Sequence, residues 1–197
     1  MSPGVHRFND GKIGPDGKLY TGVMLKDSTQ RRSNPGAAKL WCLDSDGEFT
    51  EILTDLTTPN GIAWYDVNEE NATFYYIDSR RQNILTGVHS FSAIPKFENV
   101  EVLIEFDPTT HETPDGMTIL ESGELLVAFY RSQKIAIIDP IEKSIVKEFS
   151  LAHKYPTSVF AINNQIYITH AQSENEEGGL SVIEGIEVAS VLPYQFS

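Results

Sequence analysis

The sequence contains a single cysteine, Cys42, so it has no disulfide framework within the chain. It also lacks any apolar run near the roughly 20 residues of a membrane-spanning helix, and its first ten residues do not resemble a signal peptide. Basic residues are scarce, because 15 Lys and Arg stand against 28 Asp and Glu and give a net charge of −13. These absences argue against binding to nucleic acid or to an anionic membrane. We expect a cytoplasmic protein.

Helical periodicity is nearly absent as well. Short apolar or alternating runs dominate instead, and each is bounded by Gly, Pro, Asn, Asp or Ser, a pattern typical of β-strands joined by tight turns. Cys42 lies in one of these runs, which favours a small core residue over a nucleophile. The sequence therefore predicts an all-β protein, with strands at 18–24, 39–44, 73–78, 83–91, 124–130, 134–139, 165–171 and 179–185.

A short polar trio recurs ahead of pairs of these strands. Taken alone, each trio is interpreted as an ordinary turn before a strand. The central polar residues are separated by 51, 55 and 42 residues, and a unit of about four strands at such a period is typical of a β-propeller blade. An unrelated β-sandwich is the alternative. The four trios are Asn9-Asp10-Gly11, Pro59-Asn60-Gly61, Pro114-Asp115-Gly116 and Pro156-Thr157-Ser158.

In a propeller the innermost strand of every blade lines a central channel, so equivalent positions point towards one axis. The sequence thus predicts that Asn9 or Asp10, Asn60, Asp115 and Thr157 or Ser158 converge. Carboxylate and amide oxygens suit Ca²⁺, Mg²⁺ or Mn²⁺. The histidines show no metal-ligand spacing. Two basic segments, "STQRRSN" (28–34) and "SRRQN" (79–83), are interpreted as solvated loop charges rather than anion sites.

Several motifs together carry a family resemblance. "RFNDGKIGPDGKLYTGVM", "PNGIAW", "FYYIDS", "PDGMTILESGELLVAFY" and the closing "LPYQF" occur in this order from Arg7 to Phe196. The sequence resembles the regucalcin and gluconolactonase family, the senescence marker protein 30-like lactonases. The resemblance implies a six-bladed β-propeller with one divalent cation (Ca²⁺, Zn²⁺, Mn²⁺ or Mg²⁺) in its channel, which hydrolyses sugar lactones.

The resemblance also implies roles for particular residues. It makes Asn60 and Asp115 metal ligands, and Asp115 the general base as well. Arg7 and Asn9 would contact the substrate hydroxyls or the lactone. An acidic substrate-binding residue would fall at Asp27, in the segment "VMLKDS".

The sequence departs from the family at its start. Family members are longer, and this chain begins just before "RFND". The resemblance therefore leads us to expect that it lacks about two blades and a Glu metal ligand of the family's N-terminal third. We expect residues 1–197 to form a single partial propeller domain of about four blades. An open arc is favoured over a rearranged four-bladed ring or a truncated gene product, and its exposed strand edges allow self-association.

Two functions follow from these observations. The first is metal-dependent hydrolysis of a small sugar lactone. The alternative is a calcium-binding or inactive truncated family member without catalysis, because the missing Glu removes one ligand and one negative charge from the cation site.

Overall fold

Four antiparallel sheets make up the computed structural model, which describes residues 4–110, 112–174 and 177–197. Each sheet follows the strand order of the sequence, as expected for propeller blades, and the described part of the last sheet has three strands. Blade 1 comprises β1 (His6–Ile13), β2 (Leu19–Leu25), β3 (Ala38–Leu43) and β4 (Phe49–Leu56). Blade 2 comprises β5 (Pro59–Tyr65), β6 (Asn71–Asp78), β7 (Asn83–Ser90) and β8 (Lys96–Glu105). Blade 3 comprises β9 (Thr113–Ile119), β10 (Leu125–Tyr130), β11 (Lys134–Asp139) and β12 (Ser144–Ser150). Blade 4 comprises β13 (Pro156–Ile162), β14 (Gln165–His170) and β15 (Gly179–Glu184).

Three short helical segments connect these strands. They are the α-helix α1 (Ser28–Ser33) and the 3₁₀ turns η1 (Ser79–Arg81) and η2 (Pro108–Thr110). In the described residues no helix combines the length and apolar character needed to cross a membrane. The all-β prediction and the prediction of about four blades are both confirmed.

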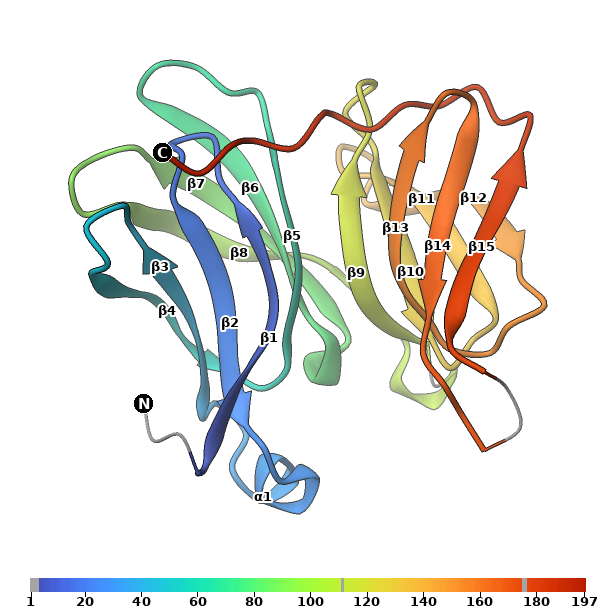
Figure 1. Ribbon diagram of the computed structural model, residues 1–197, viewed down its shortest axis with the longest axis horizontal. Coiled ribbons are helices and arrows are strands. Elements are labelled where there is room, and N and C mark those ends of the chain that lie inside the picture. Colours follow the sequence, from blue (N-terminus) through green and yellow to red (C-terminus); the bar gives the residue numbers. More distant parts are fainter. Residues whose placement is uncertain (1–3, 111, 175–176) are drawn as a thin grey trace.

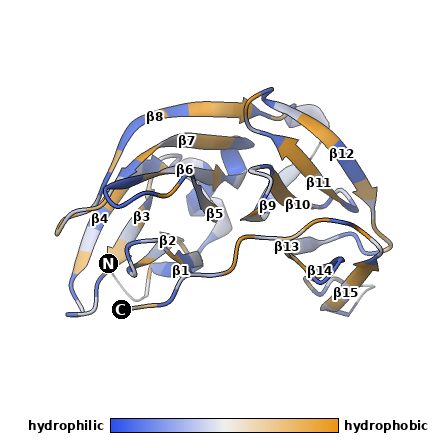
Figure 2. Ribbon diagram, turned by 90° about the horizontal axis from the view of Figure 1, so that it is seen from above, coloured by the Kyte–Doolittle hydropathy of each residue, from blue (hydrophilic) through white to orange (hydrophobic). Residues whose placement is uncertain are grey.

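The blades stand side by side around a common axis, with β1, β5, β9 and β13 innermost (Figures 1 and 2). Each inner strand packs on that of the next blade, from β1 to β5, β9 and β13. The C-terminal segment then runs back from blade 4 to blade 1 (Figure 1). Ser190 N donates to Ala161 O in blade 4, and Ser197 N donates to Gly17 O in the turn between β1 and β2. This segment therefore ties the last blade to the first.

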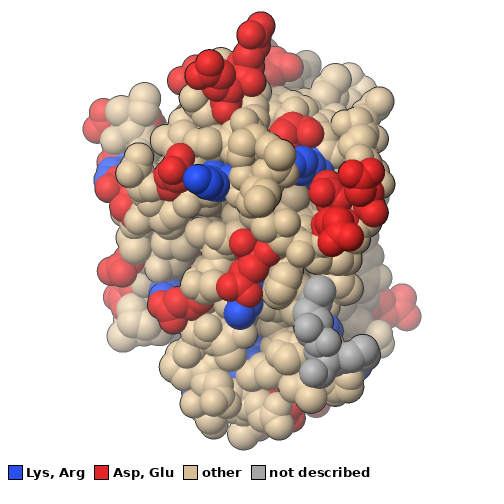
Figure 3. All heavy atoms as spheres, turned by 90° about the vertical axis from the view of Figure 1, so that its left-hand side faces the viewer, with Lys and Arg blue, Asp and Glu red and all other residues tan. Residues whose placement is uncertain are grey.

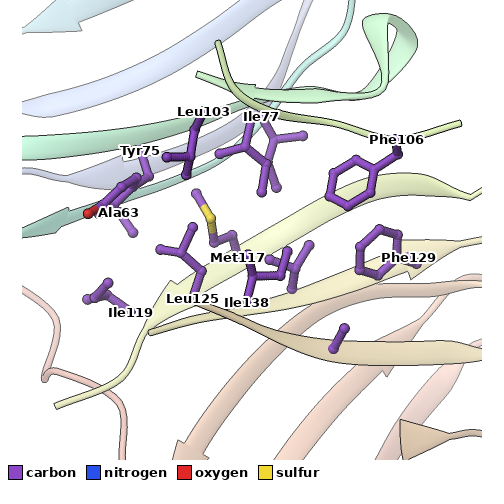
Figure 4. Close-up of a cluster of buried hydrophobic side chains, with 13 residues drawn as sticks. Ala63, Tyr75, Ile77, Leu103, Phe106, Met117, Ile119, Leu125, Phe129 and Ile138 are labelled. Carbon is purple, nitrogen blue, oxygen red and sulfur yellow. The ribbon is translucent and has the colours of Figure 1, made fainter. Parts of the chain in front are cut away.

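The core lies between neighbouring blades. Figure 4 shows the cluster between blades 2 and 3, in which Met117, Leu125 and Ile138 face Ile77 and Leu103. Middle strands such as β10 are buried on both faces, whereas the outermost strands β8 and β12 are mostly exposed. A strand covered by sheets on both sides has no polar face, which explains the continuous apolar run "LLVAF". Blade-to-blade packing thus fixes the positions of the inner strands.

The recurring trios are not turns. They lie inside the inner strands, and the register of each inner strand shifts at that point, between Phe8 and Gly11 in β1 and between Pro59 and Ile62 in β5. The same shift occurs at Asp115-Gly116 in β9 and at Thr157 in β13. In each case the inner strand has one residue more than its partner, which is a β-bulge. The interpretation of the trios as turns is wrong. The chain does not reverse its direction at these residues, and they form a bulge within a continuous strand instead.

The glycines of two trios allow the inner strands to approach closely. A Cβ atom on Gly61 would lie 2.5 Å from Met117 N and 2.9 Å from Asp115 O, and one on Gly116 would lie 2.5 Å from Thr157 O. Neither glycine has a positive φ. Backbone-to-backbone contact between blades, and not an unusual backbone conformation, therefore excludes a side chain here.

Replacement of Gly61 by Ala tests this contact. We expect Gly61→Ala to lower the free energy of unfolding by about 1–3 kcal/mol, because the backbone of β9 has to move away. Urea denaturation would measure the change. Gly4→Ala is the matched control, because a Cβ atom there meets no atom within 4 Å. Equal stability of the two variants would contradict the close packing of β5 on β9.

A buried polar network joins blades 1 and 2. Trp64 Nε1 donates to His89 Nδ1 (3.0 Å), and His89 Nε2 lies 2.7 Å from the Tyr20 hydroxyl. The Tyr20 hydroxyl donates to Asp16 Oδ2 (2.8 Å). Because Nδ1 accepts a hydrogen bond from Trp64, the single proton of a neutral imidazole sits on Nε2, and His89 donates to Tyr20. Burial, with a smaller effect of Lys18, lowers the pKa of His89 to about 3.

Acidic side chains are spread over the surface. Figure 3 shows them across the side of the molecule that carries blade 1, with Lys and Arg only at separate points. The predicted self-association through strand edges remains a prediction.

Candidate functional site

A cavity of about 750 Å³ opens at one end of the channel, where the inner strands β1, β5 and β9 begin. Four of the residues predicted from the sequence line it, namely Arg7, Asn9, Asn60 and Asp115. Their convergence follows from the bulges, since Asn9, Asn60 and Asp115 occupy the extra-residue position of successive blades. Residues separated by more than a hundred positions in the sequence thus share one site.

A chain of hydrogen bonds connects three blades at this cavity. Asn9 Nδ2 donates to Asn60 Oδ1 (2.8 Å) and to Pro59 O (2.7 Å). Asn60 Nδ2 donates to Ser79 Oγ (2.5 Å), and Ser79 Oγ donates to Pro114 O (2.5 Å). These contacts hold the Asn60 amide with its oxygen away from Ser79. They also use both hydrogens of the Asn9 amide, so its oxygen remains as an acceptor.

Asp115 is the carboxylate of the cavity. Burial raises the pKa of Asp115 to about 7, and the negative charge of Asp10 adds to the effect. Among the residues that the structure describes, none donates a hydrogen bond to this carboxylate. A desolvated carboxylate without a partner is stabilised by a cation or by a proton.

The donor set at this point consists of oxygen atoms. The Asp115 carboxylate and the Asn60 amide oxygen suit a hard divalent cation such as Ca²⁺, Mg²⁺ or Mn²⁺. Among the described residues, no three His, Cys, Asp or Glu side chains come together as a metal-binding group. The two oxygen ligands therefore fit part of a cation site, and further ligands would have to complete it.

Arg7 lines the cavity with an exposed side chain and lies near a second arginine, Arg31. Its guanidinium pKa is below the ordinary value because of partial burial and the positive charge of Arg31. Two like charges held near one another favour a negatively charged ligand between them.

Asp27 does not line the cavity. It is the N-cap of α1, where its carboxylate accepts a hydrogen bond from Gln30 N (2.7 Å), and it is exposed. The bulges of the inner strands bring Asn9, Asn60 and Asp115 to the cavity. Asp27 follows β2 and does not lie in an inner strand, so no bulge directs its side chain there. Its role in substrate binding stays a prediction.

Five of the cavity residues that the sequence analysis missed bear on the chemistry of the site. Ser79 bridges Asn60 and Pro114, and four further arginines line the wall: Arg31, Arg32, Arg80 and Arg131. Three of these four come from "STQRRSN" and "SRRQN", which were interpreted as solvated loop charges. Both segments directly follow a strand that pairs with an inner strand, β2 or β6, and so emerge at the end of the channel where the inner strands begin. That position is the signal that would have identified them.

A second cavity, of about 230 Å³, lies further along the inner strands and is bordered by the C-terminal segment. Lys12 and Asp10 line it, and Lys12 Nζ donates to Met117 O (2.9 Å). Burial lowers the pKa of Lys12 to about 8 and raises that of Asp10. Asp10 and Asn9 are adjacent in sequence but line different cavities, Asp10 this one and Asn9 the larger one.

Comparison with known proteins places this geometry in a family. The model of the SMP-30/Gluconolactonase/LRE-like region matches residues 3–172. A protein of Bacillus subtilis, YvrE, which is provisionally named a sugar lactone lactonase, is 33% identical over 154 residues. An uncharacterized protein of Sulfolobus acidocaldarius is 33% identical over 192 residues, and human regucalcin is 26% identical over 212 residues.

Solved structures agree with the sequence comparison. A luciferin-regenerating enzyme superposes with a TM-score of 0.83 over 98% of this chain and 66% of its own, at 26% identity. A calcium-binding protein of Agrobacterium tumefaciens, also named regucalcin, has the same fold, with a TM-score of 0.79 over 98% of this chain and 65% of its own.

The alignments cover most of this chain but only part of the length of each relative. The alignments cover 77% of this chain but 48% of YvrE, 96% of this chain and 66% of the Sulfolobus protein, and 98% of this chain and 67% of human regucalcin. The aligned part still includes the inner strands and the cavity of Asp115. On these grounds the chain belongs to the SMP-30/gluconolactonase/LRE-like family.

Proposed function

We propose that the cavity of Asp115 hydrolyses sugar lactones. The observation that carries this proposal is the Asp115 carboxylate, which has no hydrogen-bond partner among the described residues and lines the same cavity of about 750 Å³ as the Asn60 amide. This volume is in the usual range of small-molecule sites. The membership in a family that includes gluconolactonases supports a lactone as the substrate.

Asp115 and Asn60 are the residues that would hold a divalent cation, with one carboxylate and one amide oxygen. A cation bound there would polarise the lactone carbonyl and stabilise negative charge on its oxygen. The fixed orientation of the Asn60 amide, between Asn9 and Ser79, supports this role, because no side-chain rotation is needed to present its oxygen.

Asp115 is the general base that accepts a proton from the attacking water. A general base is most effective when its pKa lies near the operating pH, and burial raises the pKa of Asp115 to about 7 in the cation-free protein. The water oxygen forms a bond to the lactone carbonyl carbon while Asp115 accepts the proton. The ring C–O bond then breaks, and the proton passes from Asp115 to the ring oxygen. The product is an open-chain hydroxy acid.

Asn9 and Arg7 position the sugar ring. The Asn9 amide donates both of its hydrogens within the protein, so its oxygen is the atom that accepts from a sugar hydroxyl. Arg7 donates from the mouth of the cavity, where only part of its side chain is buried.

Calcium binding without catalysis is a second candidate function. Two oxygen ligands from Asp115 and Asn60 suit Ca²⁺, and a protein of the same fold is described as calcium-binding. In this case the cavity would bind the ion but release no hydrolysed product.

An assay of glucono-δ-lactone hydrolysis with added Ca²⁺, Zn²⁺, Mn²⁺ or Mg²⁺, performed beside thermal denaturation, tests both functions. We expect a divalent cation to raise the melting temperature, because it binds the folded state only, and to support turnover. Asn60→Ala should lose at least half of the rise in melting temperature, because one of the two oxygen ligands is gone. A rise in melting temperature without turnover would favour the second function, and no rise with any cation would contradict the cation site.

A further inference from the structure

Five of the six arginines of the chain line the cavity of Asp115. They come from three blades: Arg7 from β1, Arg31 and Arg32 from α1, Arg80 from η1, and Arg131 from the turn after β10. None of the nine lysines, all of which lie in the described residues, lines this cavity. In a chain with a net charge of −13, the arginines are therefore gathered at one cavity, whereas the lysines lie elsewhere.

The five arginines are not neutralised by the protein. The described residues provide no carboxylate within 4.0 Å of any of them, whereas the sixth arginine, Arg81, forms ion pairs with Asp55 and Asp78. Asp115 is the acidic residue that shares their cavity. A group of like charges in one cavity costs free energy in the absence of a ligand, and an anion bound among them removes that cost.

Some of the arginines are held in place by other contacts. Arg31 Nη1 donates to Leu25 O (2.6 Å) and Lys26 O (2.7 Å), which fixes its guanidinium beside β2. The guanidinium of Arg131 lies 5.8 Å from the centre of the Tyr130 ring, and Tyr130 also lines the cavity. Side chains held in this way lose less conformational entropy when they bind a ligand.

The basic residues of the cavity are all arginines, and this indicates the type of anion that they bind. The planar guanidinium presents a fork of N–H donors that matches the oxygens of carboxylates and phosphates in pairs. One carboxylate engages one such fork, whereas a phosphate ester has three terminal oxygens and about two negative charges. A set of five arginines exceeds what a single carboxylate can use.

We infer that the lactone bound in this cavity carries a phosphate ester, which the arginines hold while its ring carbonyl faces Asp115. The inference rests on the proposed lactone hydrolysis for the reacting end of the ligand. The phosphate is unchanged by the reaction. Hydrolysis breaks the ring C–O bond as described above, and the product is a phosphorylated hydroxy acid.

Binding of product analogues tests the inference without any turnover. Isothermal titration calorimetry would compare gluconate, glucarate, 6-phosphogluconate and inorganic phosphate. We expect 6-phosphogluconate to bind at least about tenfold more tightly than gluconate, which lacks the phosphate, and than glucarate, which has a second carboxylate in its place. Inorganic phosphate alone should bind more weakly than 6-phosphogluconate, because it makes no contact with Asn9.

Variants of the arginines test the assignment to this cavity. Arg32→Gln and Arg131→Gln should each lower the affinity for 6-phosphogluconate about three- to tenfold and leave that for gluconate nearly unchanged. Arg131→Lys should restore only part of the loss, because it keeps the charge without the fork. Lys147→Gln, on the exposed strand β12 and outside the cavity, is the matched control and should bind like the unchanged protein.

The outcomes separate this inference from the proposed function. Equal affinity for gluconate and 6-phosphogluconate, or for glucarate and 6-phosphogluconate, would overturn the phosphate assignment, even if glucono-δ-lactone is hydrolysed. A phosphate-dependent affinity that Arg131→Gln removes, in a protein without lactone hydrolysis, would support the phosphate site and contradict the catalytic proposal alone.

Discussion

Asp115→Asn is expected to reduce lactone hydrolysis by about 10³-fold or more. A positioned general base contributes roughly 10²–10⁴-fold to a rate, and the asparagine amide cannot accept the proton of the attacking water. The same substitution removes the only charged oxygen ligand that we assign to the cation. The rise in melting temperature with added Ca²⁺ or Mn²⁺ should therefore disappear together with the turnover.

The fold should survive this substitution. Asp115 accepts no hydrogen bond from the described residues, and Asn has nearly the same shape. Removal of its raised-pKa carboxylate relieves desolvation, so the variant should be at least as stable as the unchanged protein without cations at pH 7. Asp66→Asn, at an exposed position after β5, is the matched control. If Asp115→Asn kept a turnover rate within tenfold of that control, the proposed role of Asp115 would be wrong.

The second large effect is expected at His89. Its imidazole is fully buried, accepts from Trp64 Nε1 and donates to the Tyr20 hydroxyl. His89→Ala would leave the buried Trp64 Nε1 without its hydrogen-bond acceptor and would open a cavity between blades 1 and 2, while the Tyr20 hydroxyl would keep only its bond to Asp16. We expect the free energy of unfolding to fall by about 3–5 kcal/mol, as measured by urea denaturation at pH 7.5.

Stability should also depend on pH through His89. Its folded-state pKa of about 3 lies below the ordinary value of 6.5, so the unfolded chain binds more protons between these pH values. The stabilisation by neutral His89 is complete above pH 6.5 and is lost as the pH falls towards 3, by up to about 1.4 kcal/mol per pH unit. Asp16 lies 3.6 Å from His89 Nε2, but it does not offset this loss of stability. The second proton of a charged imidazole would have to bind Nδ1, which already accepts the hydrogen of Trp64 Nε1.

Asp115 has the opposite effect in part of this range. Its folded-state pKa of about 7 is above the ordinary value of 3.8, so protonation favours the folded state as the pH falls through 7. The pH dependence of His89 is therefore best measured in the Asp115→Asn background. There, stability should fall more steeply between pH 6.5 and 4 than in the double variant Asp115→Asn/His89→Gln, in which residue 89 does not titrate. Parallel curves for the two proteins would show that His89 stays neutral for another reason.

The sequence by itself determined the blades. Alternating and apolar runs bounded by Gly, Asp and Pro define strands that are covered on one face or on both, and the spacing of the trios gave the period of the repeat. It also predicted that Asn9 or Asp10, Asn60, Asp115 and Thr157 or Ser158 converge. Asn9, Asn60 and Asp115 do line one cavity, whereas Asp10 and Ser158 line the other. The motif resemblance pointed to the same residues and to Arg7, and all four line the same cavity.

The nature of the trios was decided by the tertiary structure. Pro-Asn-Gly and Pro-Asp-Gly are common turn sequences, and nothing local distinguishes a turn from a bulge within an inner strand. The contact of Gly61 with the backbone at Met117 of the next blade makes the difference. A single sequence does not contain that contact, because the two residues lie in separate repeats.

Only the tertiary structure brought the arginines together. In the sequence, Arg31, Arg80 and Arg131 stand in unrelated loops of an acidic chain, where a solvated charge is the ordinary interpretation. The strands before them all run towards the same end of the channel, so these loops meet around Asp115. Whether a surface charge is isolated or part of a binding site depends on distances between blades, and those distances are set by the packing of apolar strand faces far from the charges themselves.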